Sequence, residues 1–541
     1  MRPSRLLPLA GWLLLAGCES DLPDATPRPG VYDPDVLPGP GSLPRLTRSQ
    51  YRHAITDLLG PAIVVPAALE PDIPIEGSVA LGTTTLAVSA RGVGLYERAA
   101  YAIAEQAMAE GPARDALVTC APTGPGDAAC AGEVLAPLAR RAYRRTPSPE
   151  ELEALVAVAV NAGATLGDFH DGLEYGIAAI LMTPDFLYRP ALGGAAPEGG
   201  ALSQLELASR LAFFLWDTLP DDALLDHAEA GTLEGAGLEA EVDRMLADPR
   251  LAQGLRAFAT DWLELDRLSN LSKDSTMFRA ASAELGPDAR EETLRFLEHH
   301  FLTEEVPYRD IFTSRTTFVN RRLASIYGVE APAREGFGAV TLPEDGERIG
   351  LLGHASLLSL HAHATSTSPT LRGKFIRTTL LCTEIPPPPA SVETTIPPPS
   401  VDATTLRDRL AAHRDSPACA ACHTALDPIG LGLEQFDGIG ALRTLDNGAP
   451  IDASGHLDDR PFTTGRQLAE LVAEHPELVS CFVERVFRYA TGSEPAGDDE
   501  GALHDANQRF VGGGTRYRAL VRAIALSPSF RAVRAPHAEA R

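Results

Sequence analysis

The strongest constraint on the fold is the spacing of apolar side chains, which repeats at helical intervals from Thr47 onward. Capping residues also mark three helix starts. Thr47 precedes a helix that Gly60 ends, and Ser148 and Ser203 each stand three residues before a glutamate. The apolar faces after these starts comprise Tyr51, Ile55, Leu58 and Leu59, then Leu152, Leu155, Val156 and Ala159, then Leu207, Leu211, Phe214 and Leu215. These patterns predict a chain built mainly of α-helices.

Strand signals are sparse by comparison. Residues 337–342 and the region 451–458 could form short strands, and no alternating series of strands and helices indicates a parallel sheet. A chain of 541 residues is also too long for one hydrophobic core. We therefore predict a mainly α, multidomain protein made of helical bundles with few short strands.

The first residues are typical of an export signal. Arg2 and Arg5 give a positive start, 6–15 is a short apolar run, and the sequence LAGC ends at Cys18. The run is shorter than the roughly 20 residues that span a bilayer, so it predicts a cleaved lipoprotein signal peptide at 1–18 with Cys18 lipidated. An ordinary signal peptide with an incidental cysteine is the alternative. We expect a cell-envelope protein, held to the membrane by its lipid anchor alone and facing the periplasm or the exterior.

The net charge of the chain limits the classes of partner that it can be expected to bind. The chain has 73 acidic and 47 basic residues, a formal net charge of −26. This excess of negative charge disfavours nucleic acid and anionic membrane surfaces, so we expect no nucleic-acid partner. An acidic surface can attract a cationic partner, and it can equally serve solubility alone.

One short motif carries recognisable chemistry. Cys419, Cys422 and His423 form the sequence CAACH. Haem c attachment needs two thiols on one helical turn to reach both vinyl groups, and an adjacent histidine to bind the iron. The predicted export signal agrees with this, because c-type haem is attached outside the cytoplasm. We therefore predict one covalent haem c on Cys419 and Cys422, with His423 as an axial iron ligand.

Three alternatives compete for the motif. A zinc site could use both cysteines with His413 and His423, but no second ligand pair has zinc-finger spacing. A thioredoxin-like redox pair would need a βαβ context, and a disulfide is sterically poor within one helical turn. The following residues 427–430 (DPIG) are expected to break the helix and to offer a carbonyl to the His423 Nδ1–H, a plain turn being the alternative.

The second axial ligand is less defined. No methionine follows Met277, which excludes a methionine downstream of the motif. His361 and His363, upstream in the same predicted domain, are candidate distal ligands, with hydrogen-bonding surface roles as the alternative. The haem propionates have three candidate partners, which are Arg372, Lys374 and Arg443. A solvated surface position is the alternative for each of them.

Four cysteines remain after the lipid site and the motif, and an exported chain can oxidise them. They are Cys120, Cys130, Cys382 and Cys481, and four cysteines allow three pairings. Pairing Cys120 with Cys130 across a Pro/Gly loop is the simplest choice, and it leaves Cys382 for Cys481. Neither pairing follows from sequence alone, and buried free thiols are the alternative for the second pair.

Breaks in periodicity and composition divide the chain. Residues 19–43 are predicted to be a Pro/Gly-rich tether, and 385–400 an extended proline-rich connection. The predicted domains are an N-terminal helical domain at 44–112, a helical hairpin at 113–165, a central helical domain at 166–335, a cytochrome c-like domain with the CxxCH at 336–450 and a C-terminal helical domain at 451–541.

With these residues in hand, the chain resembles the planctomycete-type cytochrome proteins, which join several domains of unknown function and also occur in other large-genome bacteria. The segments that carry the resemblance are 43–60, 140–152, 180–190, 206–225, 318–329, 348–358, 367–382, 419–443 and 481–492. Family members often carry an additional N-terminal cytochrome module, but 19–43 contains no CxxCH, which implies a single haem here. Relatives often place methionine where this chain has Leu426, so that position has no expected haem role.

The resemblance implies architecture and haem but no substrate. We therefore carry three hypotheses. The first is a lipid-anchored mono-haem electron-transfer protein with a redox or envelope protein partner. The second is a haem-dependent, peroxidase-like oxidoreductase, so whether the protein is an enzyme stays open. The third is an envelope protein that binds polysaccharide or another protein. No Ser/His/Asp order, P-loop or dinucleotide fingerprint favours the enzyme.

Overall fold

The computed structural model describes residues 41–85, 87–193, 199–386, 398–414, 417–495 and 500–534. Cys18 and most of the predicted tether lie outside these ranges, as does most of the proline-rich connection. Within them the protein is mainly helical with few short strands, so the predicted fold class is confirmed. No helix of this described part is long and apolar enough to cross a membrane.

The N-terminal lobe (residues 41–193) is a helical bundle around its own core. Its helices are α1 (Arg48–Leu59), α2 (Val79–Thr85), α3 (Ala90–Met108), α4 (Pro112–Leu117), α5 (Ala128–Tyr143), α6 (Pro149–Leu166), α7 (Phe169–Met182) and α8 (Pro184–Leu187). The predicted caps form here: Thr47 and Ser148 each make a capping box with the residue three positions on. Buried side chains of α1, α3 and α5 to α8 form one continuous core.

The larger C-terminal lobe (residues 199–534) begins with a second group of helices. Its first elements are β1 (Gly199–Ala201), α9 (Gln204–Leu215), α10 (Asp222–Glu229), α11 (Gly235–Ala247), α12 (Leu251–Trp262), η1 (Leu265–Asn270), α13 (Leu285–Glu298), η2 (His299–Thr303), η3 (Tyr308–Phe312), β2 (Thr316–Val319), α14 (Arg321–Tyr327) and β3 (Gly338–Thr341). Ser203 forms the second predicted capping box, at the start of α9. The expected strand at 337–342 is present as β3, and it pairs antiparallel with β2, which lacks a sequence signal.

The rest of this lobe carries the CAACH motif and the C-terminus. Its elements are η4 (Leu351–Gly353), α15 (Ala355–Leu360), α16 (Pro369–Phe375), η5 (Ile376–Leu380), α17 (Leu406–Arg414), α18 (Pro417–Leu431), β4 (Leu445–Asp446), β5 (Ala449–Pro450), β6 (Gly455–Leu457), β7 (Arg460–Phe462), α19 (Gly465–Glu474), α20 (Glu477–Thr491), α21 (Glu500–Gly512), α22 (Tyr517–Ala525) and β8 (Ala532–Arg534). The strand expected near 451–458 is present as β6, paired with β7.

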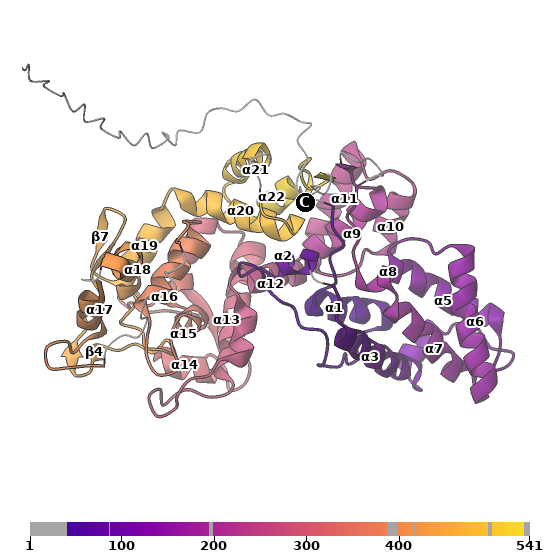
Figure 1. Ribbon diagram of the computed structural model, residues 1–541, viewed down its shortest axis with the longest axis horizontal. Coiled ribbons are helices and arrows are strands. Elements are labelled where there is room, and N and C mark those ends of the chain that lie inside the picture. The colour runs from indigo at the N-terminus through magenta and orange to yellow at the C-terminus, as the bar shows by residue number, and fades with distance from the viewer. Residues whose placement is uncertain are drawn as a thin grey trace, which may run out of the picture.

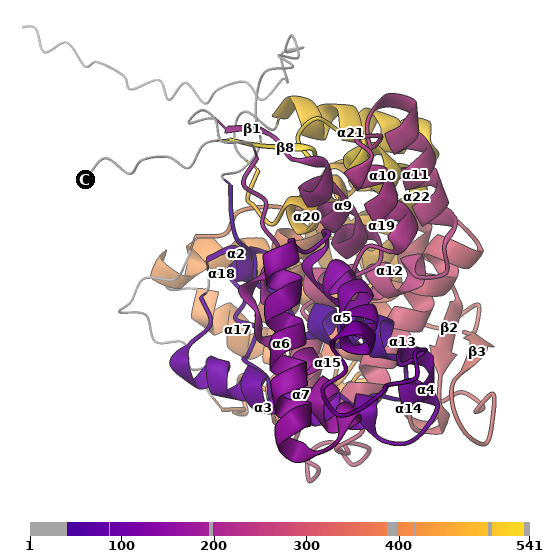
Figure 2. The same ribbon diagram turned by 90° about the vertical axis from the view of Figure 1, so that its right-hand side faces the viewer.

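The C-terminal lobe closes on itself through its last residues. Strand β8 pairs antiparallel with β1 at the lobe's other chain end, and one core extends from Ala191 to Val533. An aromatic cluster forms its centre: Tyr308 stacks on Phe482 of α20 with ring centroids 3.9 Å apart. Figure 1 shows α20 lying across the upper part of the molecule, with α18 and α19 on its left and the N-terminal helices on its right, and Figure 2 shows β1 beside β8.

Both predicted disulfides are confirmed. Cys120 is bonded to Cys130 in the N-terminal lobe, and Cys382 to Cys481 across a sequence separation of 99 residues. The second bond ties the chain just after η5 to α20. It therefore links the region of the CAACH motif to the C-terminal helices.

Candidate functional site

The CAACH motif lies on α18 with both thiols reduced. Cys419 is buried, Cys422 is half-buried, and neither takes part in a disulfide, whereas the other four described cysteines are paired. The Cys422 Sγ lies 3.9 Å from the carbonyl oxygen of Pro386. Covalent attachment of a haem requires two thiols one helical turn apart that are not in a disulfide. Cys419 and Cys422 meet this requirement.

The imidazole of His423 is held by a carboxylate. Its Nδ1 lies 3.0 and 3.1 Å from the two oxygens of Asp427, which is completely buried one helical turn further on. The Thr370 hydroxyl of α16 donates to the same carboxylate at 2.7 Å. A carboxylate in this position accepts the Nδ1–H, fixes the ring orientation and makes the other ring nitrogen, Nε2, more basic as a metal ligand.

The expected helix break at 427–430 is wrong. α18 continues through Pro428 to Leu431, and a carboxylate rather than a carbonyl accepts from His423. Proline in a helix removes one backbone hydrogen bond and crowds the carbonyl of the preceding turn, but here close packing of α18 against α16 keeps the helix continuous. A Cβ at Gly373 would overlap the Leu426 carbonyl, and one at Gly430 would overlap that of Pro369. The two helices therefore cross in backbone contact on both sides of Pro428.

The two candidate distal histidines lie just upstream of α16. His361 follows α15 and stacks on Phe375 with ring centroids 4.6 Å apart, and its Nε2 is buried without a hydrogen-bond partner. Burial and nearby cations lower the pKa of His361 to about 3, so its imidazole is neutral. His363 is exposed in the turn closed by the bridge between Ala362 and Thr367. Neither contacts His423 in the described structure, so a distal ligand stays a prediction.

Two of the arginines expected near the haem propionates bind other groups of the protein. All four terminal N–H groups of Arg372 donate to backbone carbonyls, and its side chain is 1% exposed, so neither the propionate nor the surface role fits. Arg443 binds Glu434, Asp446 and Thr367. Lys374 is exposed.

The donor set on α18 fits a c-type haem. It provides two thiols for the vinyl groups and an oriented imidazole for the iron, and the chemistry that the group supplies is a one-electron couple. The zinc alternative stays open, because it needs the side chain of His413; the described residues alone contain no cluster of three or more His, Cys, Asp or Glu side chains able to hold a metal ion. The side chain of His413 lies outside the described part.

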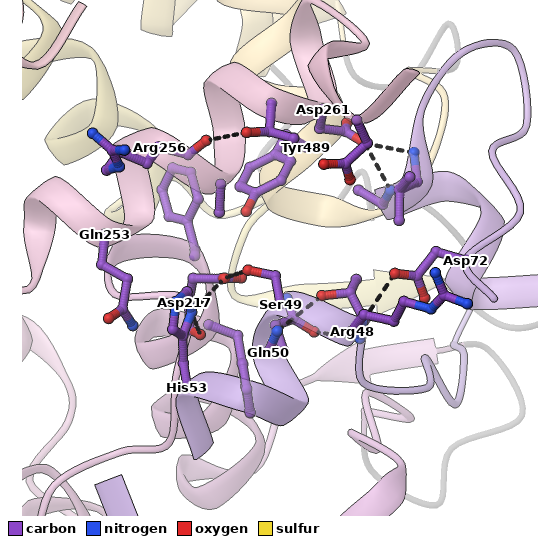
Figure 3. Close-up of a pocket in the computed structure, with 18 of the residues that line it drawn as sticks. Arg48, Ser49, Gln50, His53, Asp72, Asp217, Gln253, Arg256, Asp261 and Tyr489 are labelled. Carbon is purple, nitrogen blue, oxygen red and sulfur yellow. Dashed lines mark hydrogen bonds and ion pairs between the residues drawn. The ribbon is translucent and has the colours of Figure 1, made fainter. Parts of the chain in front are cut away.

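A second site, unforeseen in the sequence, is a cleft of about 1260 Å³ between the two lobes. It is lined by α1 and the segment before α2, by α9, α12 and α13, and by the end of α20. Figure 3 shows Tyr489 and Asp261 on one side of the open space and Ser49 and Asp217 on the other. The described lining contains no residue of 348–446, so the cleft is separate from the CAACH motif.

Asp217 is the centre of a polar cluster in this cleft. It is buried, has a φ of 53°, and accepts from the Ser49 hydroxyl and from Nδ1 of His53, the latter at 2.9 Å. Because serine and histidine both bind the carboxylate rather than each other, the cluster is no Ser–His–Asp relay. The group can position a polar ligand but offers no activated nucleophile.

Asp261 on α12 closes the opposite wall. It accepts from the Ser78 hydroxyl at 2.8 Å and from the backbone N–H groups of Val79 and Ala80. Burial raises the pKa of Asp261 to about 6, against the lowering effect of these hydrogen bonds. The carboxylate thus fixes α2 to the C-terminal lobe and shapes the cleft.

Five family models match the chain in tandem, each described as a protein of unknown function. They are DUF1587 at 45–109, DUF1595 at 130–190, DUF1592 at 202–329, DUF1588 at 348–446 and DUF1585 at 458–530. No curated protein and no solved structure matches it. The CAACH motif falls within the DUF1588 match, while the other four contribute to the cleft. The chain thus carries, in tandem, the planctomycete cytochrome c-associated set of domains of unknown function.

Proposed function

We propose that the protein is an exported, lipid-anchored, mono-haem c-type electron-transfer protein. The observation that carries the proposal is the α18 turn. It combines the two reduced cysteines of the described chain with a histidine whose Nδ1 is bound to the buried Asp427. Cys419 and Cys422 would hold the haem, and His423 would bind its iron. The helical domains would dock the donor or acceptor protein.

Expression with and without a cytochrome c maturation system tests the proposal. With that system, the chain should keep haem stain on a denaturing gel, and without it the chain should be colourless. Cys419→Ala combined with Cys422→Ala should abolish the stain. The matched control is Cys120→Ala with Cys130→Ala, which removes two cysteines of a disulfide and should leave the stain unchanged. Stain retained in the first variant would overturn the haem assignment.

A peroxidase-like oxidoreductase is the second candidate, favoured by the carboxylate on His423. An imidazole bonded to a buried carboxylate donates more electron density to a metal, which favours the ferric state. The visible spectrum separates the two functions. A six-coordinate, low-spin spectrum unchanged by cyanide supports electron transfer, and a high-spin ferric spectrum that changes with peroxide supports the oxidoreductase.

The lipid anchor rests on Cys18, outside the described residues. Cys18→Ala should move the protein from the membrane fraction to the soluble fraction, because the described chain contains no helix able to span a bilayer. Incorporation of a labelled fatty acid into this variant would contradict the anchor.

A further inference from the structure

Two arginines in the wall of the inter-lobe cleft, Arg189 and Arg210, form no ion pair among the described residues. Several other cleft arginines are ion-paired, such as Arg250, whose guanidinium lies 2.8 Å from Asp221. Arg189 lies over the Phe213 ring at 4.9 Å, and its Nε is buried without a hydrogen bond. Arg210 donates to the Phe530 carbonyl at 2.9 Å.

The two arginines are half-buried in the cleft wall, and each guanidinium lies over an aromatic ring, Arg189 over Phe213 and Arg210 over Phe530. Burial lowers the pKa of each to about 10, and for Arg210 repulsion from Arg189 adds to the effect. Both still carry a charge at neutral pH. Two carboxylates attract these guanidiniums and raise their pKa values, Asp217 that of Arg189 and Glu206 that of Arg210, but each carboxylate already accepts hydrogen bonds from other groups. An anion that enters the cleft could therefore form the ion pairs that the two half-buried guanidiniums lack among the described residues.

A neutral polar group marks the same wall. The hydroxyl of Ser209 on α9 is buried without a hydrogen-bond partner in the described structure, although the residue is only 4% exposed. Buried hydroxyls are nearly always satisfied, so a missing partner indicates a missing ligand or ordered water. Ser209 is adjacent in sequence to Arg210 and lines the same cleft. Ser209, whose hydroxyl lacks a hydrogen-bond partner among the described residues, therefore lines the same cleft as the two arginines that form no ion pair with those residues.

The size and remaining lining of the cleft define the class of ligand. Its volume of about 1260 Å³ far exceeds that of a single inorganic anion. The opposite walls present the Asp217 carboxylate, the His53 imidazole and the Tyr489 ring, with the Tyr489 hydroxyl turned toward the open space (Figure 3). Acceptors, donors and aromatic faces together suit a ring with many hydroxyl groups.

We propose that the cleft binds an acidic carbohydrate, with its carboxylate or sulfate group on Arg189 and Arg210. The sugar hydroxyls bind Asp217 and His53, and a ring packs on Tyr489. This site is independent of the haem, because the motif on α18 contributes nothing to the cleft lining in the described chain. Residues from four of the five matched segments meet there.

Calorimetric titration of the full, haem-loaded chain tests the proposal. Three tetrasaccharide probes distinguish the ligand chemistry: tetramannuronate carries carboxylates, a carrageenan tetramer carries sulfates, and cellotetraose is neutral. At least one acidic probe should bind, and cellotetraose should bind at least tenfold more weakly, since a charge-assisted hydrogen bond is lost. The tighter acidic probe identifies the anionic group. No binding of either acidic probe, or equal binding of cellotetraose, would overturn the proposal.

Substitutions of the cleft residues test whether the acidic probe binds in the cleft. Arg189→Gln and Arg210→Gln should each weaken binding of the acidic probe at least tenfold. Arg509→Gln is the matched control, because Arg509 is exposed on α21 and pairs with Asp505 outside the cleft. Equal losses in the control would show surface charge attraction and overturn the site. Tyr489→Phe keeps the ring and loses the hydroxyl. If neither Arg210→Gln nor Tyr489→Phe weakens binding, the cleft is not the carbohydrate site.

Thermal unfolding without ligand gives a second readout. Because Arg189 forms no ion pair with the described residues of the free protein, Arg189→Gln should leave the melting temperature nearly unchanged while losing the ligand-induced increase. A purely structural arginine would lower the melting temperature when replaced. A lower melting temperature with unchanged probe affinity would therefore overturn the role of Arg189.

Discussion

The haem motif and the inter-lobe cleft are built in opposite ways. The motif places both thiols and the histidine within five consecutive residues of α18, so its chemistry is local. The cleft brings Ser49 of α1 to Asp217 after α9, and both lie across the open space from Tyr489 of α20. A local motif can be recognised from spacing alone. A site assembled by tertiary packing is visible only once the lobes are placed.

Helix α20 connects these two regions. Near its start, Cys481 is bonded to Cys382 beside the α16–α18 pair, and near its end Tyr489 lines the cleft. Eight residues of α-helix separate the two positions, or about 12 Å. Arg488 on the same helix donates to the Glu76 carbonyl of the N-terminal lobe. Perturbing α20 should therefore affect both sites, and perturbing either site should leave the other intact.

The largest effect is expected from Cys382→Ala combined with Cys481→Ala. Opening a loop of 99 residues releases chain entropy in the unfolded state. The expected loss in unfolding free energy is about 4 to 5 kcal/mol. Urea unfolding monitored by circular dichroism gives the value. The Cys120–Cys130 bond encloses a separation of only 10 residues, so its removal should cost less. Equal losses for both bonds would contradict the view that α20 is the main connection.

The second largest effect is expected from a substitution that perturbs the α16–α18 pair and leaves the cleft unchanged. Gly373→Ala would push a methyl group into the Leu426 carbonyl, whereas Gly512→Ala, the control in α21, meets no atom within 4 Å. We expect a loss of about 3 kcal/mol and less haem incorporation for the first variant. The control should be neutral or more stable by about 0.5–1 kcal/mol. Acidic tetrasaccharide binding should persist in both. If it disappears in the Gly373 variant, the two regions are not independent.

A smaller effect concerns the electronic state of the haem. Asp427→Asn keeps an acceptor for the His423 Nδ1–H but removes the negative charge, so the imidazole becomes a weaker donor. The reduction potential should rise by roughly 60 mV, equivalent to a tenfold change in a one-electron equilibrium. Redox titration at fixed pH measures it. Asp446→Asn is the control, since Asp446 binds Arg443 rather than the histidine. An unchanged potential would refute the carboxylate effect.

The smallest effect is expected from Ser49→Ala in the cleft. The substitution removes one donor to the buried Asp217 and leaves the His53 bond in place. Unfolding free energy should fall by about 1 kcal/mol. The haem spectrum should be identical to that of the unmodified protein. A changed spectrum would show that the cleft and the motif communicate, which the comparison excludes.

Sequence reasoning predicted the helix caps and, by elimination, the disulfides. The Thr47 cap and the capping boxes of Ser148 and Ser203 form as expected, and both disulfides have the predicted partners. Caps are local, and elimination left a single remaining pair of cysteines. Proline was misjudged at position 428, because its local preference to end a helix was overridden by packing against α16.

The cleft could not be predicted for a physical reason. Arg189, Arg210 and Asp217 each look like ordinary charged residues at the ends or faces of helices, and such residues are usually solvated. Their significance comes from the cleft that they line together and from the partners that each has or lacks there, which depend on how the lobes pack. The same holds for Arg372, whose buried hydrogen bonds to four carbonyls are invisible in a one-dimensional pattern.

The pairing of β1 with β8 has a consequence for the order in which the chain folds. Residues 199–201 obtain their strand partner only when 532–534 have been synthesised, and the core they close needs α20 and α22. If the chain emerges from its N-terminus, α9 and α12 therefore lack these C-terminal packing partners until almost the whole chain has emerged. During that interval the thiols of α18 emerge before Cys481 does. We expect haem attachment to take place on this open intermediate, before the last helices close over the lobe.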